Sequence, residues 1–527
     1  MGPSGDPRQE KKLPAGNNCN NVPRHRQDGW CGLKVAFTFQ RAVRTALSCP
    51  APVRLIMDHP AKNADALLID STVVCENSHG VEIRGRLARL GRHQVAFEAD
   101  CPASALQVSE VLSSLQINRQ GRTLYRGRAV VTALMDQGLG LLCEASLGEE
   151  WLEAARMDST SLRADFAEFM RQWRRFQRIQ PEFKSTVADM RAFLGDLRLW
   201  LEQAELDLVE RPGGQKAGER ELAQRVTELA FPAVEALFER FEHLASAIPA
   251  DECAAHQWFL QREFQPLVLA SPFAERVIRK PLGYAGDYEM VNMILRDPHE
   301  GSSLYGRVLN RWFIGQPPAE AHRNRAAYLT QRLADETFRT MRQNRPLRVF
   351  NVGCGPAGEV QNYLAQCEAA SHAQFTLLDF NEETIQYTRR VLQASLRQHR
   401  RTTDIEFVKK SVVQLLKARP KEGEPAPQYD FVYCAGLYDY LPNSICRQLL
   451  DIFHDWVAPG GLVIVTNVDA QNPIRHWLEY VLEWHLIYRN AAQMLALRPR
   501  LASQEDVRIQ SDVTGVNLFL EIRKPMA

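Results

Sequence analysis

The chain has 527 residues, of which 45% are hydrophobic and 24% charged, and 64 Lys+Arg against 63 Asp+Glu give a formal net charge of +1. This length predicts about three or four domains, and this composition excludes wholesale disorder and collagen-like or mucin-like chains. A net charge near zero argues against electrostatic binding of nucleic acid or of an anionic membrane by the chain as a whole, so we expect no nucleic-acid partner.

Residues 1–50 are predicted to be a poorly ordered leader. No apolar run reaches the roughly 18–20 residues that a membrane-spanning helix needs, and no signal-peptide core is visible. The 11 cysteines are scattered and form no CxxC pair. We therefore expect reduced thiols in a cytoplasmic protein without a metal site or a transmembrane segment.

Residues 51–148 are rich in short β-type runs separated by turn residues at about ten-residue spacing. This spacing predicts a small antiparallel β-barrel or sandwich. The runs are Ala66–Ile69, Gly80–Ile83, Gln94–Phe97, Ala129–Val131 and Gly140–Leu142.

Residues 150–343 change to a helical period. Two apolar stripes are spaced three and four residues apart, as on an amphipathic helix: Phe166, Phe169, Met170, Trp173 and Phe176, then Phe183, Val187, Met190, Phe193, Leu194 and Leu197. The arginines between 171 and 178 are expected to form a solvated face. Residues 211–218 are predicted to be a linker and Val234–Ala245 a helix. We interpret this region as an arm or lid, and as a candidate homodimer interface.

The last third, residues 344–527, alternates strand and helix patterns and predicts a Rossmann-like, mostly parallel sheet with helices on both faces. The chain's end predicts an antiparallel hairpin, Val507–Gln510 and Val516–Arg523. The other predicted elements are strands Leu347–Val352, Gln374–Leu378, Ile405–Lys409, Gln428–Ala435 and Gly461–Asn467, and helices Gly358–Gln366, Glu382–Gln398 and Leu449–Trp456. The predicted fold class is thus multidomain: an N-terminal β-barrel, a central helical region and a C-terminal α/β domain.

The sharpest motif runs from Val349 to Gly358 at a strand-to-helix junction and contains Gly353-Cys354-Gly355. Glycines there allow a tight turn and a close approach to a ligand, and the helix start offers free N–H groups. Asp379 ends the next strand, 24 residues after Gly355. A carboxylate at that place can accept hydrogen bonds from ribose hydroxyls, which serves NAD and S-adenosylmethionine (SAM) equally.

Later features separate these two cofactors. Asp430 opens the fourth strand, Pro459-Gly460-Gly461 precedes the fifth, and the hairpin follows. In this order the last third resembles a class I SAM-dependent methyltransferase. Two positions depart from that pattern: Asn351 stands where an acid is usual, and Ala357 where glycine is common. The resemblance implies that SAM is the cofactor and that it is bound by Asn351, Gly353, Cys354, Gly355, Asp379, Phe380, Ser411, Ala435 and Gly436.

A narrower resemblance rests on three segments, Arg279–Tyr288, Gly436–Leu441 and Glu479–Arg489. Together they resemble bacterial extracellular-factor 3-hydroxypalmitic acid methyl ester biosynthesis enzymes. This implies O-methylation of a hydroxy fatty acid carboxylate to a methyl ester, a quorum-sensing signal, with a small acyl molecule as substrate. A protein side chain or another small molecule as acceptor, and a non-catalytic signalling adaptor with a SAM-binding fold, are the alternatives.

A fatty carboxylate is ionised at pH 7 and needs orientation rather than a strong base. The residues expected to act on it are Tyr438, Asp439, Tyr488, Arg489 and Tyr284, with Arg489 as a bidentate carboxylate anchor. Trp477, Trp484 and Tyr488 fall on one predicted helix and suit core packing as well as a site wall. Asp439 suits either a cofactor contact or a helix cap, and Tyr284 either a lid or a structural turn.

Residues 51–148 weakly resemble a degenerate PilZ barrel, a module that often binds cyclic di-GMP. Arg84, Arg86, Arg89 and Arg92 include no pair with the four-residue spacing of its RxxxR segment, and Asp70-Ser71-Thr72 does not complete its second segment. We therefore expect scaffolding or partner contact instead of cyclic di-GMP binding.

Overall fold

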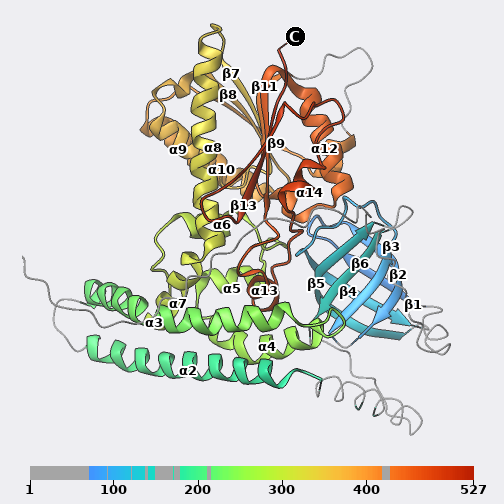
Figure 1. The fold of residues 1–527 in the computed structure, drawn as a ribbon, viewed down its shortest axis with the longest axis vertical. Helices are drawn as coiled ribbons and strands as arrows, with labels where there is room; N and C mark the ends of the chain where they lie inside the picture. The colour runs from blue at the N-terminus through green and yellow to red at the C-terminus, as the bar shows by residue number, and fades with distance from the viewer. Residues whose placement is uncertain are drawn as a thin grey trace, which may run out of the picture. The chain divides into compact units, whose positions relative to one another are not determined.

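The computed structural model describes residues 71–91, 93–119, 122–136, 141–148, 166, 170, 178–209, 215–417 and 428–526. The predicted leader, the predicted strand Ala66–Ile69, Arg92 and most of the stripe from Phe166 to Phe176 lie outside these residues. The described residues form an antiparallel barrel, a set of helices and a large sheet with helices on its faces (Figure 1). The predicted fold class is confirmed.

Six antiparallel strands close the barrel in the order β1-β2-β3-β6-β5-β4. They are β1 (Ser71–Glu76), β2 (Glu82–Leu90), β3 (Gln94–Ala99), β4 (Val111–Arg119), β5 (Arg122–Asp136) and β6 (Leu141–Leu147). Alternate residues point inward, as a pleated strand requires, and Val73, Phe97 and Ile117 are fully buried. On the outer face of β2, Arg84, Arg86 and Arg89 pair with Glu82, Glu98 and Glu144 respectively.

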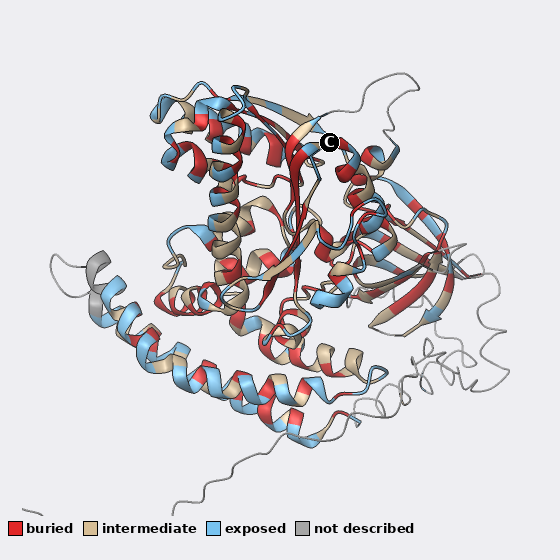
Figure 2. Ribbon diagram, turned by 45° about the horizontal axis from the view of Figure 1, so that its top comes forward, coloured by how far each residue is buried: buried red, intermediate tan, exposed pale blue. Residues whose placement is uncertain are grey.

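The central helices are α2 (Pro181–Val209), α3 (Gln215–Ser246), α4 (Cys253–Val268), α5 (Pro272–Arg279), α6 (Tyr288–Leu295), α7 (Leu304–Gly315) and α8 (Pro317–Met341). The predicted stripe of α2 is confirmed, since Phe183, Val187 and Met190 are buried, while its other face is largely exposed (Figure 2). The predicted linker is wrong over its second half. Residues 215–218 already belong to α3, because Gln, Lys and Ala favour helix more than one glycine opposes it. No described helix combines the length and apolarity needed to cross a bilayer.

The sheet has seven strands in the order β12-β13-β11-β10-β7-β8-β9. Its strands are β7 (Leu347–Val352), β8 (Ala373–Asp379), β9 (Asp404–Lys409), β10 (Tyr429–Cys434), β11 (Val457–Val468), β12 (Val507–Ser511) and β13 (Asn517–Arg523). Strands β7 to β11 pair in parallel, and β13 lies antiparallel between β11 and β12. The predicted hairpin at the end is therefore confirmed.

The sheet is buried on both faces. Val349 and Phe431 pack with α8, α9 (Gly358–Gln366) and α10 (Glu382–Gln398). Their neighbours Phe350 and Val432 pack with α11 (Val412–Lys417), α12 (Asn443–Trp456) and α14 (Ala491–Leu495). Two 3-10 turns, Glu368–His372 and Leu437–Tyr440, complete this region. Strand order reverses between β7 and β10, and ligands of open α/β sheets bind at the carboxyl ends of strands at such a reversal.

The predicted long helix through Trp477, Trp484 and Tyr488 is wrong. Helix α13 (Arg475–Tyr480) ends early, and no helix follows until α14. Glu483 adopts the left-handed backbone conformation (φ 50°). The amide of His485, two residues further on, donates to Ser109 Oγ of the barrel at 3.1 Å. These features are incompatible with a continuous helix.

Candidate functional site

A cavity lies at the carboxyl ends of β7, β8 and β10, where the strand order reverses. Its walls come from the loop after β7, from the residues that follow β8, β9 and β10, from α6 and α8, and from the extended segment 484–486. Residues far apart in the sequence thus converge on one cavity.

The loop between β7 and α9 is held in a tight, left-handed path. Gly353, Gly355 and Ala357 have φ angles of 70°, 49° and 50°. The amides of Gly353 and Cys354 both donate to the carbonyl of Leu378, at 2.8 and 3.0 Å. No described atom lies within 4 Å of the place where a Cβ on Gly355 would stand. The backbone at Gly355 is therefore open to a ligand in the cavity.

Asp379, the last residue of β8, faces this loop. Its Oδ2 accepts a hydrogen bond from Gly355 N–H at 3.2 Å, and its Oδ1 accepts one from Asn381 N–H at 3.0 Å. Burial raises the pKa of Asp379 to about 6, although both bonds oppose that rise. The carboxylate retains further lone pairs and can accept hydrogen bonds from the hydroxyls of a ribose.

Next to Asp379, aromatic rings form a wall. The ring of Phe380 lies 5.3 Å from that of Tyr284 and 4.4 Å from that of His79, measured between centroids. All three residues line the cavity. Ala435 and Gly436, at the end of β10, line it as well. Such a wall can pack against a planar base.

Ser411 is the predicted cofactor residue that the structure does not bring to the cavity. Its neighbours Lys410 and Val412 line the space. Ser411 instead turns toward α11, where its Oγ accepts a hydrogen bond from Gln414 N–H at 3.3 Å.

Another part of the cavity lining is aromatic and close-packed. Trp484 Nε1 donates to Tyr440 Oη at 3.0 Å. A Cβ on Gly286 would collide with the same oxygen, so only glycine fits there without displacing Tyr440. Within the described part of the chain, Tyr440 Oη donates to no acceptor, which leaves its proton for a ligand.

Asp439 lines the cavity and does not cap the following helix, which Pro442 precedes. Its Oδ1 accepts a hydrogen bond from Val468 N–H at 2.7 Å. Burial raises the pKa of Asp439 to about 6, and the cations Arg325 and Arg489 oppose that rise.

The cavity lining also holds charged or titratable residues that were not predicted as site residues, among them His322, Arg325 and Glu359. Burial lowers the pKa of His322 to about 3 and also lowers that of Arg325. Burial raises the pKa of Glu359, against hydrogen bonds from Tyr433 and Asn351. No local motif marks these positions. The sequence indicates them only through the order of elements, since α8 comes directly before β7, the first strand of the sheet along the chain, and α9 directly after it.

Three residues predicted to act in catalysis lie outside the cavity lining. Tyr438 is fully buried, and its hydroxyl donates to the carbonyl of Cys446 at 3.1 Å. Tyr488 packs under the guanidinium of Arg475, 4.6 Å from its ring centre. Arg489, only 2% exposed, is turned into the core. Of the predicted catalytic set, the structure brings Tyr284 and Asp439 together in the cavity.

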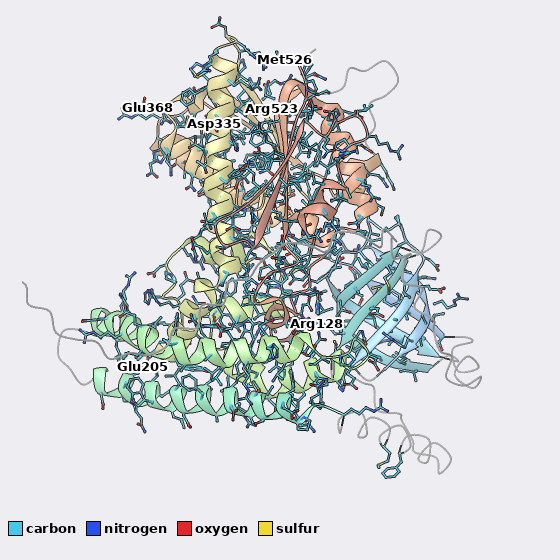
Figure 3. All side chains as sticks on the ribbon, viewed as in Figure 1. Arg128, Glu205, Asp335, Glu368, Arg523 and Met526 are labelled. Atoms are coloured by element: carbon cyan, nitrogen blue, oxygen red, sulfur yellow. The ribbon has the colours of Figure 1, made fainter. Side chains whose placement is uncertain are left out.

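The barrel contributes directly to this site. His79 and Gln107 line the cavity. The carbonyl of Gly283 accepts a hydrogen bond from Val111 N–H at 2.6 Å, and Arg128, labelled in Figure 3, donates to the carbonyl of Ile278 at 2.8 Å. The barrel therefore holds the segment that carries Tyr284 and Gly286.

Among the described residues, no group of three or more His, Cys, Asp or Glu side chains could hold a metal ion.

Residues 320–500 match the family model described as "Methyltransferase domain". No curated protein matches the chain. Among solved structures, it is similar to a possible exported protein from Bordetella parapertussis (16% identity, 66% of this chain and 99% of that chain covered, TM-score 0.34). It is also similar to magnesium protoporphyrin IX methyltransferase (ChlM) from Synechocystis PCC 6803 with bound SAM (12% identity, 39% of this chain and 83% of that chain covered, TM-score 0.27). A third similar structure is N-methyltransferase NodS from Bradyrhizobium japonicum WM9 in complex with S-adenosyl-l-homocysteine, SAH (15% identity, 45% of this chain and 98% of that chain covered, TM-score 0.28).

Proposed function

We propose that this protein methylates the carboxylate of an acyl-chain acceptor, a hydroxy fatty acid, and so forms a methyl ester. Residues 320–500 are a SAM-dependent methyltransferase domain, of enzyme class EC 2.1.1.-. The proposal therefore concerns the acceptor and the residues that meet it. The resemblance of three segments to 3-hydroxypalmitic acid methyl ester biosynthesis enzymes supports both the hydroxy acid and a signalling role for the ester.

The residues in the cavity fit SAM. The open backbone at Gly355 admits a close ligand, and the Asp379 carboxylate suits its ribose. Asn351 Oδ1, on a side chain only 1% exposed, has no hydrogen-bond partner among the described residues, as expected for a group whose partner is a ligand. When bound, SAM supplies a methyl group on a sulfonium, which is already a good leaving group.

The observation that carries the proposal is a second, much smaller cavity that shares two lining residues with the first. His322 and Trp484 line both cavities. The lining of the second cavity is mostly aromatic and aliphatic and includes Phe273, Ile294, Phe313, Ile474, Leu478 and Leu482. An apolar space that adjoins the site supports an acceptor with a hydrocarbon chain. A long chain would require Trp484 and its neighbours to move.

The chemistry of the acceptor side also supports a carboxylate. A lone pair of the carboxylate oxygen forms the new O–C bond while the S–C bond breaks and its electron pair stays on sulfur, so no proton has to leave. His322, with a pKa of about 3, is a poor general base at neutral pH. Tyr440 can donate a hydrogen bond from its hydroxyl to the acceptor carboxylate and so orient it, while the close-packed wall excludes water.

We assign the barrel a scaffolding role in this reaction. The arginines of β2 that raised the comparison with PilZ domains pair with glutamates on the barrel's own surface. The barrel meets the site instead through His79 and Gln107. Both observations support shaping of the cavity in preference to binding of cyclic di-GMP.

The test is methyl transfer from radiolabelled SAM by the purified protein to 3-hydroxy fatty acids of increasing chain length. We expect label in a solvent-extractable, alkali-labile product, and we expect Trp484→Ala to shift the preferred chain length upward. Trp200→Ala, an exposed tryptophan of α2 (53% exposed), is the control and should leave the preference unchanged. The absence of a labelled ester with every fatty acid, while a cell lysate added as acceptor becomes labelled only in its protein, would reject the acyl acceptor.

A further inference from the structure

Asn351 leaves the glycine loop without the acid that class I methyltransferases usually carry at that position, yet the cavity contains a carboxylate close by. Glu359 lies in the first turn of α9, eight residues after Asn351, and lines the same cavity. Its Oε1 accepts hydrogen bonds from Asn351 Nδ2 at 3.2 Å and from Tyr433 Oη at 2.7 Å. Two neighbouring strands, β7 and β10, therefore hold this side chain toward the cavity.

The orientation of the Asn351 amide follows from that bond. Because Nδ2 donates to Glu359, Oδ1 is the remaining polar atom, and it is buried without a hydrogen-bond partner in the part of the chain that the structure describes. An orphaned buried acceptor beside a carboxylate is a good place for a cationic donor with several N–H bonds. A carboxylate near the start of a helix is common for structural reasons alone. Those reasons do not explain why the amide oxygen of Asn351 is buried beside it with no described hydrogen-bond partner.

A cation lies near this pair. Arg325 of α8 lines the cavity and makes no hydrogen bond or ion pair with any described residue. Its Nη1 would lie 3.0 Å from a Cβ on Gly436, so the glycine leaves room for the guanidinium at the end of β10. Arg325 and Glu359 are close enough to influence each other's charge but form no direct ion pair.

We propose that Glu359 and Arg325 together bind the amino-acid end of SAM, with Glu359 and Asn351 Oδ1 receiving its α-ammonium and Arg325 its α-carboxylate. A zwitterion presents these two charges a few bonds apart, and the cavity presents their complement on adjacent helices. The carboxylate lost at position 351 is thus replaced from α9. This inference rests on SAM as the cofactor but is independent of the acceptor.

Three ligands separate the contributions in calorimetric titrations of the full-length protein. SAH carries both charged groups, decarboxylated SAM keeps only the amine, and 5′-methylthioadenosine lacks both. We expect Glu359→Gln to lower the affinity for SAH about tenfold or more and to leave the affinity for 5′-methylthioadenosine within twofold of wild type. We expect Arg325→Met to lower the affinity for SAH by a similar factor and to leave the affinity for decarboxylated SAM unchanged.

Each other outcome overturns a defined part of the inference. Unchanged SAH affinity in Glu359→Gln, or equal losses for SAH and 5′-methylthioadenosine, would show that Glu359 serves the fold only. Unchanged SAH affinity in Arg325→Met, with a raised KM for the fatty acid, would show that Arg325 binds the acceptor and not the cofactor. Because none of these titrations contains an acceptor, a wrong acyl assignment cannot produce these results.

Discussion

The amide of Gly355 donates a hydrogen bond to the carboxylate of Asp379 at 3.2 Å, although 24 residues separate them in the chain. This bond joins the two features on which the sequence argument depended, the glycine loop and the acid after the second strand. Both face one cavity, together with Phe380 and Gly436. A nucleoside placed there would meet an open backbone on one side and a buried carboxylate on the other.

Cofactor affinity should depend on pH through Asp379. Its pKa is raised to about 6, so the carboxyl gains a proton as the pH falls below that value and becomes a weaker acceptor for ribose hydroxyls. We expect SAH affinity to be constant above about pH 7 and to fall progressively below pH 6, as measured by calorimetry.

Other titratable groups face the same cavity, and the control must separate them. Asp439 also has a pKa of about 6, the pKa of Glu359 is raised, and that of His79 is lowered. Asp379→Asn should bind SAH weakly with little pH dependence between 5 and 7. Should this variant keep the full wild-type pH profile, the dependence belongs to one of the other carboxyl groups.

The order of elements in the last third could be predicted because each strand is a short apolar run and each helix has a regular period. The residue at which α13 ends could not be predicted in this way. Trp477, Trp484 and Tyr488 repeat at helical spacing, but a contact between His485 and the barrel residue Ser109, distant in sequence, decides the conformation. Arg325 and Glu359 were missed for a related reason: a residue on an ordinary helix face becomes a site residue only through tertiary packing.

Arg489 should contribute to stability rather than bind the acceptor. Its guanidinium donates to the carbonyls of Tyr438 and Leu441 and to the side chains of Asn443 and Asn467, at 2.5–2.8 Å. Arg489→Met leaves these buried acceptors unpaired, at about 1–3 kcal/mol each. We expect a loss of at least about 3 kcal/mol in urea unfolding. Arg325→Met, which breaks no such bonds, is the matched control, and equal stability of the two variants would contradict this role.

His79 should link the barrel to cofactor binding. Its ring meets Phe380 edge to face, and such contacts contribute about 0.5–1.5 kcal/mol. We therefore expect His79→Ala to weaken SAH by roughly two- to tenfold. Arg84→Ala, on the exposed face of the barrel, should have no effect. If both variants bind SAH like wild type, the barrel does not take part in the cofactor site.

Gly286 should control the acceptor side alone. A Cβ there collides with Tyr440 Oη, so Gly286→Ala must displace the hydroxyl that we expect to orient the acceptor. Turnover with the fatty acid should fall at least about tenfold while SAH affinity stays within twofold. In Gly195→Ala a Cβ meets no described atom within 4 Å, and that variant should match wild type. Full activity of Gly286→Ala would remove Tyr440 from the proposed mechanism.

The central claim is that the cavity between the glycine loop and Asp379 holds the cofactor, and titration of the wild type and Asp379→Ala with SAH tests it most directly. We predict one bound SAH per chain in the wild type and an affinity at least tenfold lower in the variant, because two hydrogen bonds to a charged group are lost at about 1.5–3 kcal/mol each. Equal affinity in the two proteins, or no binding to the wild type, would contradict the account.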